Sequence, residues 1–148
     1  MYDTPVRQAD FEFPVTNPPK RDYPFFLIQV PAGFPSPAQD YISKRIDLNE
    51  LVVKHPGSTF YAKAEGNSMF PDIADGDYMV IDRVAEISSG NIVLFCLNNE
   101  FGVKKYFQRP DGSIELVPTN PEYETINLPD ECEFEIWGKV IWSFKPHK

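Results

Sequence analysis

The sequence predicts a mostly β fold: a compact domain of short antiparallel strands with one short helix, preceded by an extended N-terminal arm. After residue 58, short runs rich in Ile, Val, Phe and Tyr alternate with turn residues, which is typical of an all-β, barrel-like sheet. Before residue 25 the chain contains five prolines, which remove backbone donors and prevent helix formation. We therefore divide the chain into an arm (1–32), a linker with a short helix (33–57) and a β-rich domain (58–148).

The arm contains one apolar segment, made of Tyr23, Pro24, Phe25 and Phe26. Two interpretations are open for it. The segment packs on the β-rich domain, or it is a short linear motif that enters the apolar groove of a partner.

The next segment, Val30 to Pro37, has three prolines in eight residues and is expected to stay extended. Ala32 and Gly33 form a small pair at its centre. A protease cleft accepts such a strand, because bulky side chains beside the scissile carbonyl hinder attack. On local grounds alone, a simple linker is the more common interpretation.

A short helix is expected after Asp47, because Asp47 and Glu50 have the spacing of a capping box ahead of Leu51, Val52 and Val53. The Pro56-Gly57 pair ends this helix. Residues 40–46 fit either a helix or an extended arm, and the sequence leaves both open.

Strands are expected over residues 59–64, 78–81, 91–97, 101–108, 113–117 and 133–144. Residues 98–100 would connect two of them as a hairpin. Trp137 and Trp142 are five residues apart on the last strand, so they should face opposite sides unless a bulge intervenes near Gly138. One of them is a candidate for a dimer interface.

Length, charge and cysteine content restrict the class of protein. A chain of 148 residues forms one domain with a real core. A net charge of −8 disfavours sequence-independent nucleic-acid binding, so no direct nucleic-acid site is expected and the partners should be proteins. Cys96 and Cys132, two core candidates, are too few for a disulfide framework and fit the reducing cytoplasm. We expect no signal peptide and no membrane span.

Ser68 lies in a Gly66-Asn67-Ser68-Met69 turn that directly follows a predicted strand, and Asp75-Gly76-Asp77 forms a second turn. A serine on such a turn is held away from the sheet, with backbone N–H groups free to face a ligand. This arrangement suits a nucleophile that also needs oxyanion donors. Most Gly-x-Ser turns are only turns, however, so the interpretation depends on a nearby base.

The base is the decisive question, because neither histidine is well placed for a catalytic triad. His55 lies in a Pro-Gly turn and His147 is the penultimate residue. No ligand cluster has the spacing of a metal site. Lys104 and Lys105 remain, and because adjacent strand residues face opposite sides, one of them points inward unless both are edge charges. Burial would lower the pKa of an inward lysine and let the neutral amine act as a general base.

Six motifs occur together in a fixed order: Gly33-Phe34-Pro35-Ser36-Pro37-Ala38, Arg45-Ile46-Asp47-Leu48-Asn49, Gly66-Asn67-Ser68-Met69, Asp75-Gly76-Asp77, Val103-Lys104-Lys105 and Leu116-Val117-Pro118-Thr119-Asn120. In this order the chain resembles the UmuD proteins, the self-cleaving subunits of the bacterial SOS mutagenic polymerase. Those proteins belong with the LexA-type Ser-Lys peptidases. The resemblance covers the chain from about Tyr23 onward, whereas residues 1–20 match nothing in that family.

The resemblance implies a catalytic site without cofactor or metal. Ser68 would be the nucleophile and Lys104 the general base, with Lys105 pointing outward. The scissile bond would be Ala32-Gly33, where the best-known UmuD has Cys-Gly. The oxyanion donors would be the backbone N–H groups of Asn67 and Ser68.

The same resemblance implies partners and a sequence of events. A RecA nucleoprotein filament would favour the conformer in which the Ala32-Gly33 strand lies in the cleft, and cleavage would remove residues 1–32. The product, residues 33–148, would form a homodimer and join a UmuC-type polymerase for synthesis across lesions. Tyr23 to Phe26 would take the place of a segment linked to the sliding clamp, with Tyr23 replacing the first Phe of that segment.

Three other classes were weighed. A LexA or phage repressor adds a helix-turn-helix, and the arm before Ala32 is too short and too rich in proline to form one. A signal peptidase needs a membrane anchor, which the sequence lacks. The remaining alternative is a non-catalytic or repressor-like relative that uses this fold as a dimeric protein-binding module.

Overall fold

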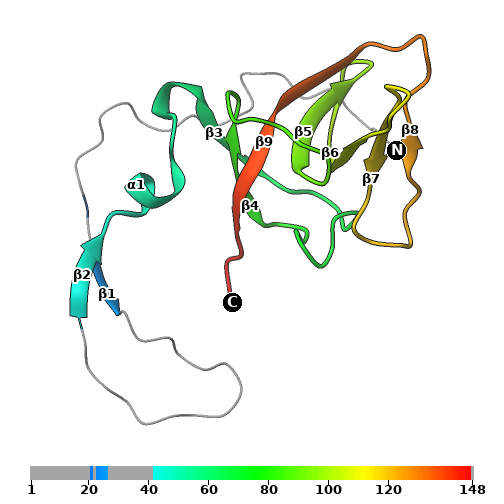
Figure 1. The fold of residues 1–148 in the computed structure, drawn as a ribbon. Helices are drawn as coiled ribbons and strands as arrows, with labels where there is room; N and C mark the ends of the chain where they lie inside the picture. Colours follow the sequence, from blue (N-terminus) through cyan, green and yellow to red (C-terminus); the bar gives the residue numbers. More distant parts are fainter. Residues whose placement is uncertain (1–20, 22, 27–41, 148) are drawn as a thin grey trace.

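The computed structural model describes residues 21, 23–26 and 42–147. Seven strands form one antiparallel sheet in the order β3-β4-β9-β5-β6-β7-β8, with β3 and β8 at its edges (Figure 1). The strands are β3 (Thr59–Lys63), β4 (Tyr78–Asp82), β5 (Ile92–Leu97), β6 (Glu100–Gln108), β7 (Ile114–Val117), β8 (Ile126–Asn127) and β9 (Phe134–Phe144). The predicted mostly β class is confirmed.

All six predicted strands are present in this sheet, with bounds within about one residue of those expected. The predicted hairpin joins β5 to β6 through Asn98 and Asn99, both with positive φ, at 49° and 67°. Asparagine tolerates this left-handed backbone, which a two-residue hairpin turn requires. Strand β8 was not predicted, because two residues give no readable alternation; it pairs with β7.

A second, two-stranded sheet lies outside the main one. Strand β1 (Tyr23–Phe26) pairs antiparallel with β2 (Ile42–Ile46), with Tyr23 opposite Ile46. This settles the open choice for residues 42–46 in favour of an extended strand. In Figure 1 the β1–β2 pair and helix α1 lie to the left of the main sheet, on the side of β3 and β4. The predicted cleavage pair, Ala32 and Gly33, lies outside the described residues.

Helix α1 (Leu48–Val52) begins where the capping box predicted it. The Asp47 carboxylate accepts a hydrogen bond of 2.9 Å from the backbone N–H of Asn49, which satisfies a donor that the helix itself cannot. The other carboxylate oxygen of Asp47 accepts a 3.1 Å bond from the N–H of Arg21. A short 3₁₀ turn, η2 (Pro56–Ser58), then leads into β3. Asp47 thus connects the arm, the helix and the linker.

The core lies on both faces of the sheet, because alternate residues of β5 contribute to different clusters. One cluster contains Leu94 together with Phe60, Met69, Ile73, Met79 and Ile81. The other contains Val93, Phe95, Leu97 and Leu116. Burial on both faces explains why β5 is a continuous apolar run. The first cluster includes Met69, so the residue after Ser68 anchors its loop in the core.

Strand β9 is bulged opposite β5 at Trp137, since Leu94 faces Gly138 and Phe95 faces Ile136. A bulge near Gly138, the exception to the expectation that Trp137 and Trp142 face opposite sides, is therefore present. Trp137 packs against the first core cluster and contacts the Phe101 ring edge-on at 4.8 Å. Trp142 is 41% exposed and lies beyond a second irregularity in the pairing of β9 with β4.

Both cysteines, Cys96 and Cys132, are free and half-buried; the prediction of core positions holds only in part. Cys132 packs against the second core cluster. Burial raises the pKa of the Cys96 thiol. Among residues 21, 23–26 and 42–147, no helix is long and apolar enough to cross a membrane.

Candidate active site

Ser68 lies on a loop that begins after β3 and is closed by the two turns that the sequence predicted. Gly66 and Gly76 have φ angles of 85° and 87°, a left-handed backbone that glycine adopts without strain. The N–H of Gly66 donates to the Asp75 carboxylate at 2.7 Å, and the N–H of Asp75 donates to the side-chain oxygen of Asn67 at 3.3 Å. These two hydrogen bonds join the turn at Gly66 to the turn at Gly76, and Ser68 lies on the first turn.

Asp77 is the last residue of the Ser68 loop before β4, and its side chain fixes this end of the loop. Its side chain is 4% exposed and accepts bonds from the Ala74 N–H at 2.9 Å and the Lys145 amine at 2.7 Å. Burial alone would raise the pKa of Asp77, but these hydrogen bonds and the positive charge of Lys145 outweigh burial and lower the pKa. Asp77 thus stays ionised and ties the loop to the C-terminal segment after β9.

The structure brings the two predicted catalytic side chains into contact. Lys104 lies on β6, and its amine donates to the Ser68 hydroxyl oxygen at 2.8 Å and to the Val103 carbonyl at 3.1 Å. Burial lowers the pKa of Lys104, because the charged amine loses solvation. A larger share of this amine is therefore neutral near neutral pH, and a neutral amine can accept the hydroxyl proton over this distance.

Lys105, the next residue, does not reach Ser68. Its amine lies 3.3 Å from the Asp72 carboxylate, and both side chains are partly exposed. The alternation of β6 thus separates the two lysines as predicted: one contacts the serine and the other forms an ion pair nearer the surface. An exposed pair of this kind contributes little to stability, about 0–1 kcal/mol.

The proposed oxyanion donors lie on the same loop. Across the part of the chain that the structure describes, neither the Asn67 N–H nor the Ser68 N–H donates to a backbone carbonyl. The Asn67 carbonyl accepts bonds from the Phe70 N–H at 3.1 Å and from the Asn120 side chain at 3.0 Å. The backbone around Ser68 is therefore fixed through its carbonyl groups rather than through its N–H groups.

Two residues of the site were given no role by the sequence reasoning. The backbone N–H of Asn120 donates to the Ser68 carbonyl at 3.0 Å, and the Thr119 hydroxyl donates to Asp72 at 2.9 Å. Both belong to the segment after β7, which the sequence analysis noted only as part of the resemblance. The one local signal was the Asn120-Pro121 pair, which is typical of a turn and does not identify a contact across the fold.

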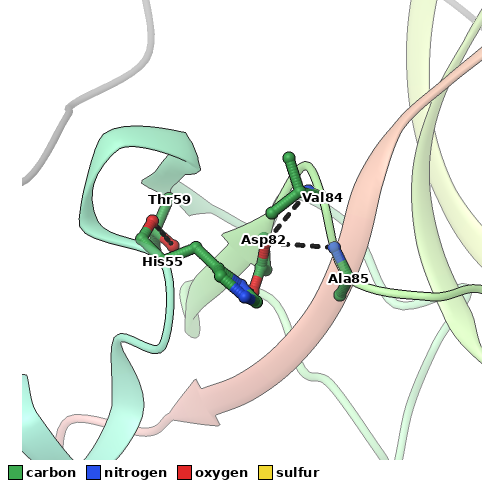
Figure 2. A network of polar contacts seen from close by, with 5 residues as sticks. All are labelled: His55, Thr59, Asp82, Val84 and Ala85. Carbon is green, nitrogen blue, oxygen red and sulfur yellow. Dashed lines mark hydrogen bonds and ion pairs between the residues drawn. The ribbon is translucent and has the colours of Figure 1, made fainter.

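The described partner of the His55 side chain is Asp82, at the end of β4. Figure 2 shows its ring against Asp82, with Nδ1 2.6 Å from a carboxylate oxygen. Asp82 is 2% exposed, and its other oxygen accepts from the N–H groups of Val84 and Ala85 at 3.0 and 3.2 Å. The Thr59 hydroxyl donates to the His55 carbonyl. This network fastens the segment before β3 to the end of β4.

Within residues 21, 23–26 and 42–147, no three His, Cys, Asp or Glu side chains gather closely enough to hold a metal ion. The groups that this site brings together are the Ser68 hydroxyl, a lysine with a lowered pKa, and backbone N–H groups on the same turn.

Comparison with known proteins gives one family match and several similar proteins. A family model described as Peptidase S24-like matches residues 24–141. Protein MucA of Salmonella typhimurium is 41% identical over 126 residues, which cover 84% of this chain and 85% of MucA. Protein ImpA of Salmonella typhimurium is 37% identical over 119 residues, which cover 80% of this chain and 82% of ImpA. The LexA repressor of Clostridium perfringens is 32% identical over 120 residues, which cover 80% of this chain and 57% of the repressor.

Proposed function

Because this chain belongs to the Peptidase S24-like family, we propose that Ser68 and Lys104 form a Ser-Lys dyad that cuts the chain's own arm between Ala32 and Gly33. The observation that supports this most directly is the 2.8 Å contact between the Lys104 amine and the Ser68 hydroxyl. The lowered pKa of Lys104 is the second, since a protonated lysine could not accept the serine proton.

The reaction would proceed by acyl transfer. Neutral Lys104 takes the Ser68 proton as Oγ attacks the Ala32 carbonyl carbon, and the N–H groups of Asn67 and Ser68 stabilise the oxyanion. The C–N bond to Gly33 then breaks, and the leaving amine receives the proton held by Lys104. Water, deprotonated by the same lysine, hydrolyses the ester between Ser68 and Ala32 and restores the hydroxyl.

Self-cleavage fits an arm that is part of the same chain, because the bond is already present at high effective concentration. The arm must still reach the serine, and this docking is a change of population that a partner can favour. We propose that the partner is a RecA nucleoprotein filament. Residues 33–148 would then form a homodimer and serve as the accessory subunit of a UmuC-type error-prone polymerase in SOS mutagenesis in the cytoplasm.

Binding to the sliding clamp by Tyr23, Pro24, Phe25 and Phe26 is also part of this proposal. Strand β1 consists of these four residues, and their backbone pairs with β2. A partner that takes the segment as an extended peptide would have to separate it from β2. A four-residue strand pair is a weak constraint, so this separation is within the energy that a protein partner can supply.

Incubation of the purified full-length protein at pH 7 to 10, followed by intact-mass measurement, tests the proposal. We expect a fragment that begins at Gly33, and its rate of formation should rise with pH, about tenfold per unit, until Lys104 is mostly neutral. Ser68→Ala and Lys104→Ala should each abolish the fragment, while Lys105→Ala serves as the matched control and should still yield it. A fragment that persists in Ser68→Ala would exclude Ser68 as the nucleophile.

Absence of cleavage, even with RecA, nucleotide and single-stranded DNA added, would favour the non-catalytic binding module instead. If the wild-type chain does cleave, mixing an uncleavable Gly33→Trp chain that retains Ser68 with an intact Ser68→Ala chain separates cleavage across a dimer from cleavage within one chain. A Gly33 fragment from the second chain can only arise across the dimer.

A further inference from the structure

The segment that follows β7 holds the Ser68 backbone on both sides. The Asn120 backbone N–H donates to the Ser68 carbonyl at 3.0 Å, and the Asn120 side-chain amide donates to the Asn67 carbonyl, also at 3.0 Å. The side-chain oxygen of Asn120 accepts from the Glu122 N–H at 3.0 Å. The NH₂ group of the Asn120 side chain thus donates to one partner, and its oxygen accepts from another. These two contacts together determine the orientation of the amide.

A peptide group is planar and trans, so its carbonyl and its N–H point in opposite directions. The Asn67 carbonyl shares one peptide group with the Ser68 N–H. The Asn120 side chain and the Phe70 N–H both bind the Asn67 carbonyl, and together they set the direction in which the Ser68 N–H points. That N–H is one of the two oxyanion donors of the proposed reaction.

The same segment is also tied to the strand that bears the lysine. Strand β7 pairs with β6, with Val117 opposite Lys105, and Asn120 follows three residues later. Thr119 and Lys105 both contact the Asp72 carboxylate on the serine loop. A continuous series of hydrogen bonds therefore connects β6, which carries Lys104, through β7 and Asn120 to the backbone of Ser68. This series helps to set the distance between Ser68 and Lys104.

We propose that Asn120 is a positioning residue for the self-cleavage proposed above, on which this inference rests. It aims the Ser68 N–H at the oxyanion and holds the serine hydroxyl at the Lys104 amine. The hydrogen bonds of Asn120 at this site go to the carbonyl groups of Asn67 and Ser68. It acts only through the two peptide groups that flank Ser68.

Three variants separate this role from a merely structural one. Asn120→Ala removes the side-chain donor to Asn67 and keeps the backbone bond to Ser68. Asn120→Asp keeps the shape and the acceptor for the Glu122 N–H, but places a carboxylate oxygen against the Asn67 carbonyl. Asn127→Asp makes the same chemical change at an exposed residue of β8 and is the matched control.

The measurement is the self-cleavage rate of the full-length variants from pH 7 to 10.5, with the melting temperature of each. Loss of one oriented oxyanion donor costs about 100- to 1,000-fold in rate. We expect Asn120→Ala to lose about 100-fold at every pH, with the midpoint of its pH profile unchanged, because the amine environment is intact. Asn120→Asp should lose at least as much, and Asn127→Asp should cleave at the wild-type rate.

Two results would overturn the inference: a wild-type rate in Asn120→Ala, or a loss that disappears at high pH, which would mean that the residue acts through the pKa of Lys104. If the wild-type chain does not cleave, the proposed function fails, and the inference is decided by structures instead. Crystal structures of the wild-type and Asn120→Ala proteins would show whether the Asn67–Ser68 peptide group turns when the amide is lost, which supports the inference, or keeps its direction, which overturns it.

Discussion

Replacing Lys104 by Met should change stability in a pH-dependent way: relative to the Lys104 chain, the Met chain should do best at neutral pH, and this relative advantage should fall as the pH rises. Burial lowers the pKa of Lys104 below its unfolded value near 10.5, so the charged amine disfavours the fold. Below the folded pKa this penalty is fully present. Between the folded pKa and about 10.5 the unfolded state binds more protons, so stability rises with pH, and above that range the penalty is gone.

The penalty is about 1.4 kcal/mol for each pH unit by which the pKa is lowered, reduced by solvent screening because the side chain is only half-buried. We expect a net pH-dependent difference on the order of 1 kcal/mol. Loss of the 3.1 Å bond to the Val103 carbonyl opposes it by about 0.5–1.5 kcal/mol. That loss is nearly the same at every pH, because a neutral amine also donates. The pH dependence, rather than the stability at one pH, is therefore the informative quantity.

The assay is urea denaturation followed by circular dichroism at pH 7, 8, 9 and 10. Both chains should carry Ser68→Ala, so that self-cleavage cannot complicate the comparison. Lys105→Met in the same background is the matched control; it removes a partly exposed amine from the adjacent position of β6. A stability difference between the Lys104 and Lys104→Met chains that stays flat from pH 7 to 10 would refute the reasoning that burial deprotonates this amine.

Further predictions concern stability, measured by urea denaturation at pH 7. Asp82→Ala should cost about 2 kcal/mol, because the Val84 and Ala85 N–H groups lose a charged acceptor, whereas His55→Ala, at the exposed end of the same network, should cost at most about 1; equal losses would contradict this account. Gly138→Ala should cost about 1–3 kcal/mol, since its Cβ would lie 2.7 Å from a β4 side chain and 2.9 Å from a backbone oxygen, while Gly57→Ala has nothing within 4 Å and should cost clearly less. Asp47→Ala should lose about 1 kcal/mol through the helix cap, and an unchanged stability would argue against that cap.

The strands of the main sheet could be predicted from the sequence because their signals are local. Apolar runs such as Ile92–Leu97 end at turn residues, and the positive-φ Asn98 and Asn99 allow the chain to reverse. The β1–β2 pair could not be predicted in this way. Prolines obscure the strand pattern in the arm, and the partner strand lies about twenty residues away, so only the fold decides the pairing.

The candidate site could be predicted in part, because strand alternation is also a local signal. Strand alternation alone showed that one of two neighbouring lysines should face inward, but the choice of Lys104 came from the family resemblance rather than from the residues. The role of Asn120 depends on a bond to the Asn67 carbonyl, 53 positions earlier, and the His55–Asp82 pair spans 27 positions. Contacts of this kind arise from how loops cross in space, and no local pattern encodes them.

The two-residue turn at Asn98 and Asn99 determines which side chain of β6 faces Ser68. It fixes which residues of β5 and β6 stand opposite one another, and so it sets Val93 against Lys104. One additional residue in this connection would slide β6 by one position and invert every side chain along it. Val103 would then stand opposite Val93, and the amine of Lys104 would be turned toward Asp72, so no lysine amine would face the Ser68 hydroxyl. Whether a lysine amine faces the Ser68 hydroxyl thus depends on the length of a turn that contacts neither group.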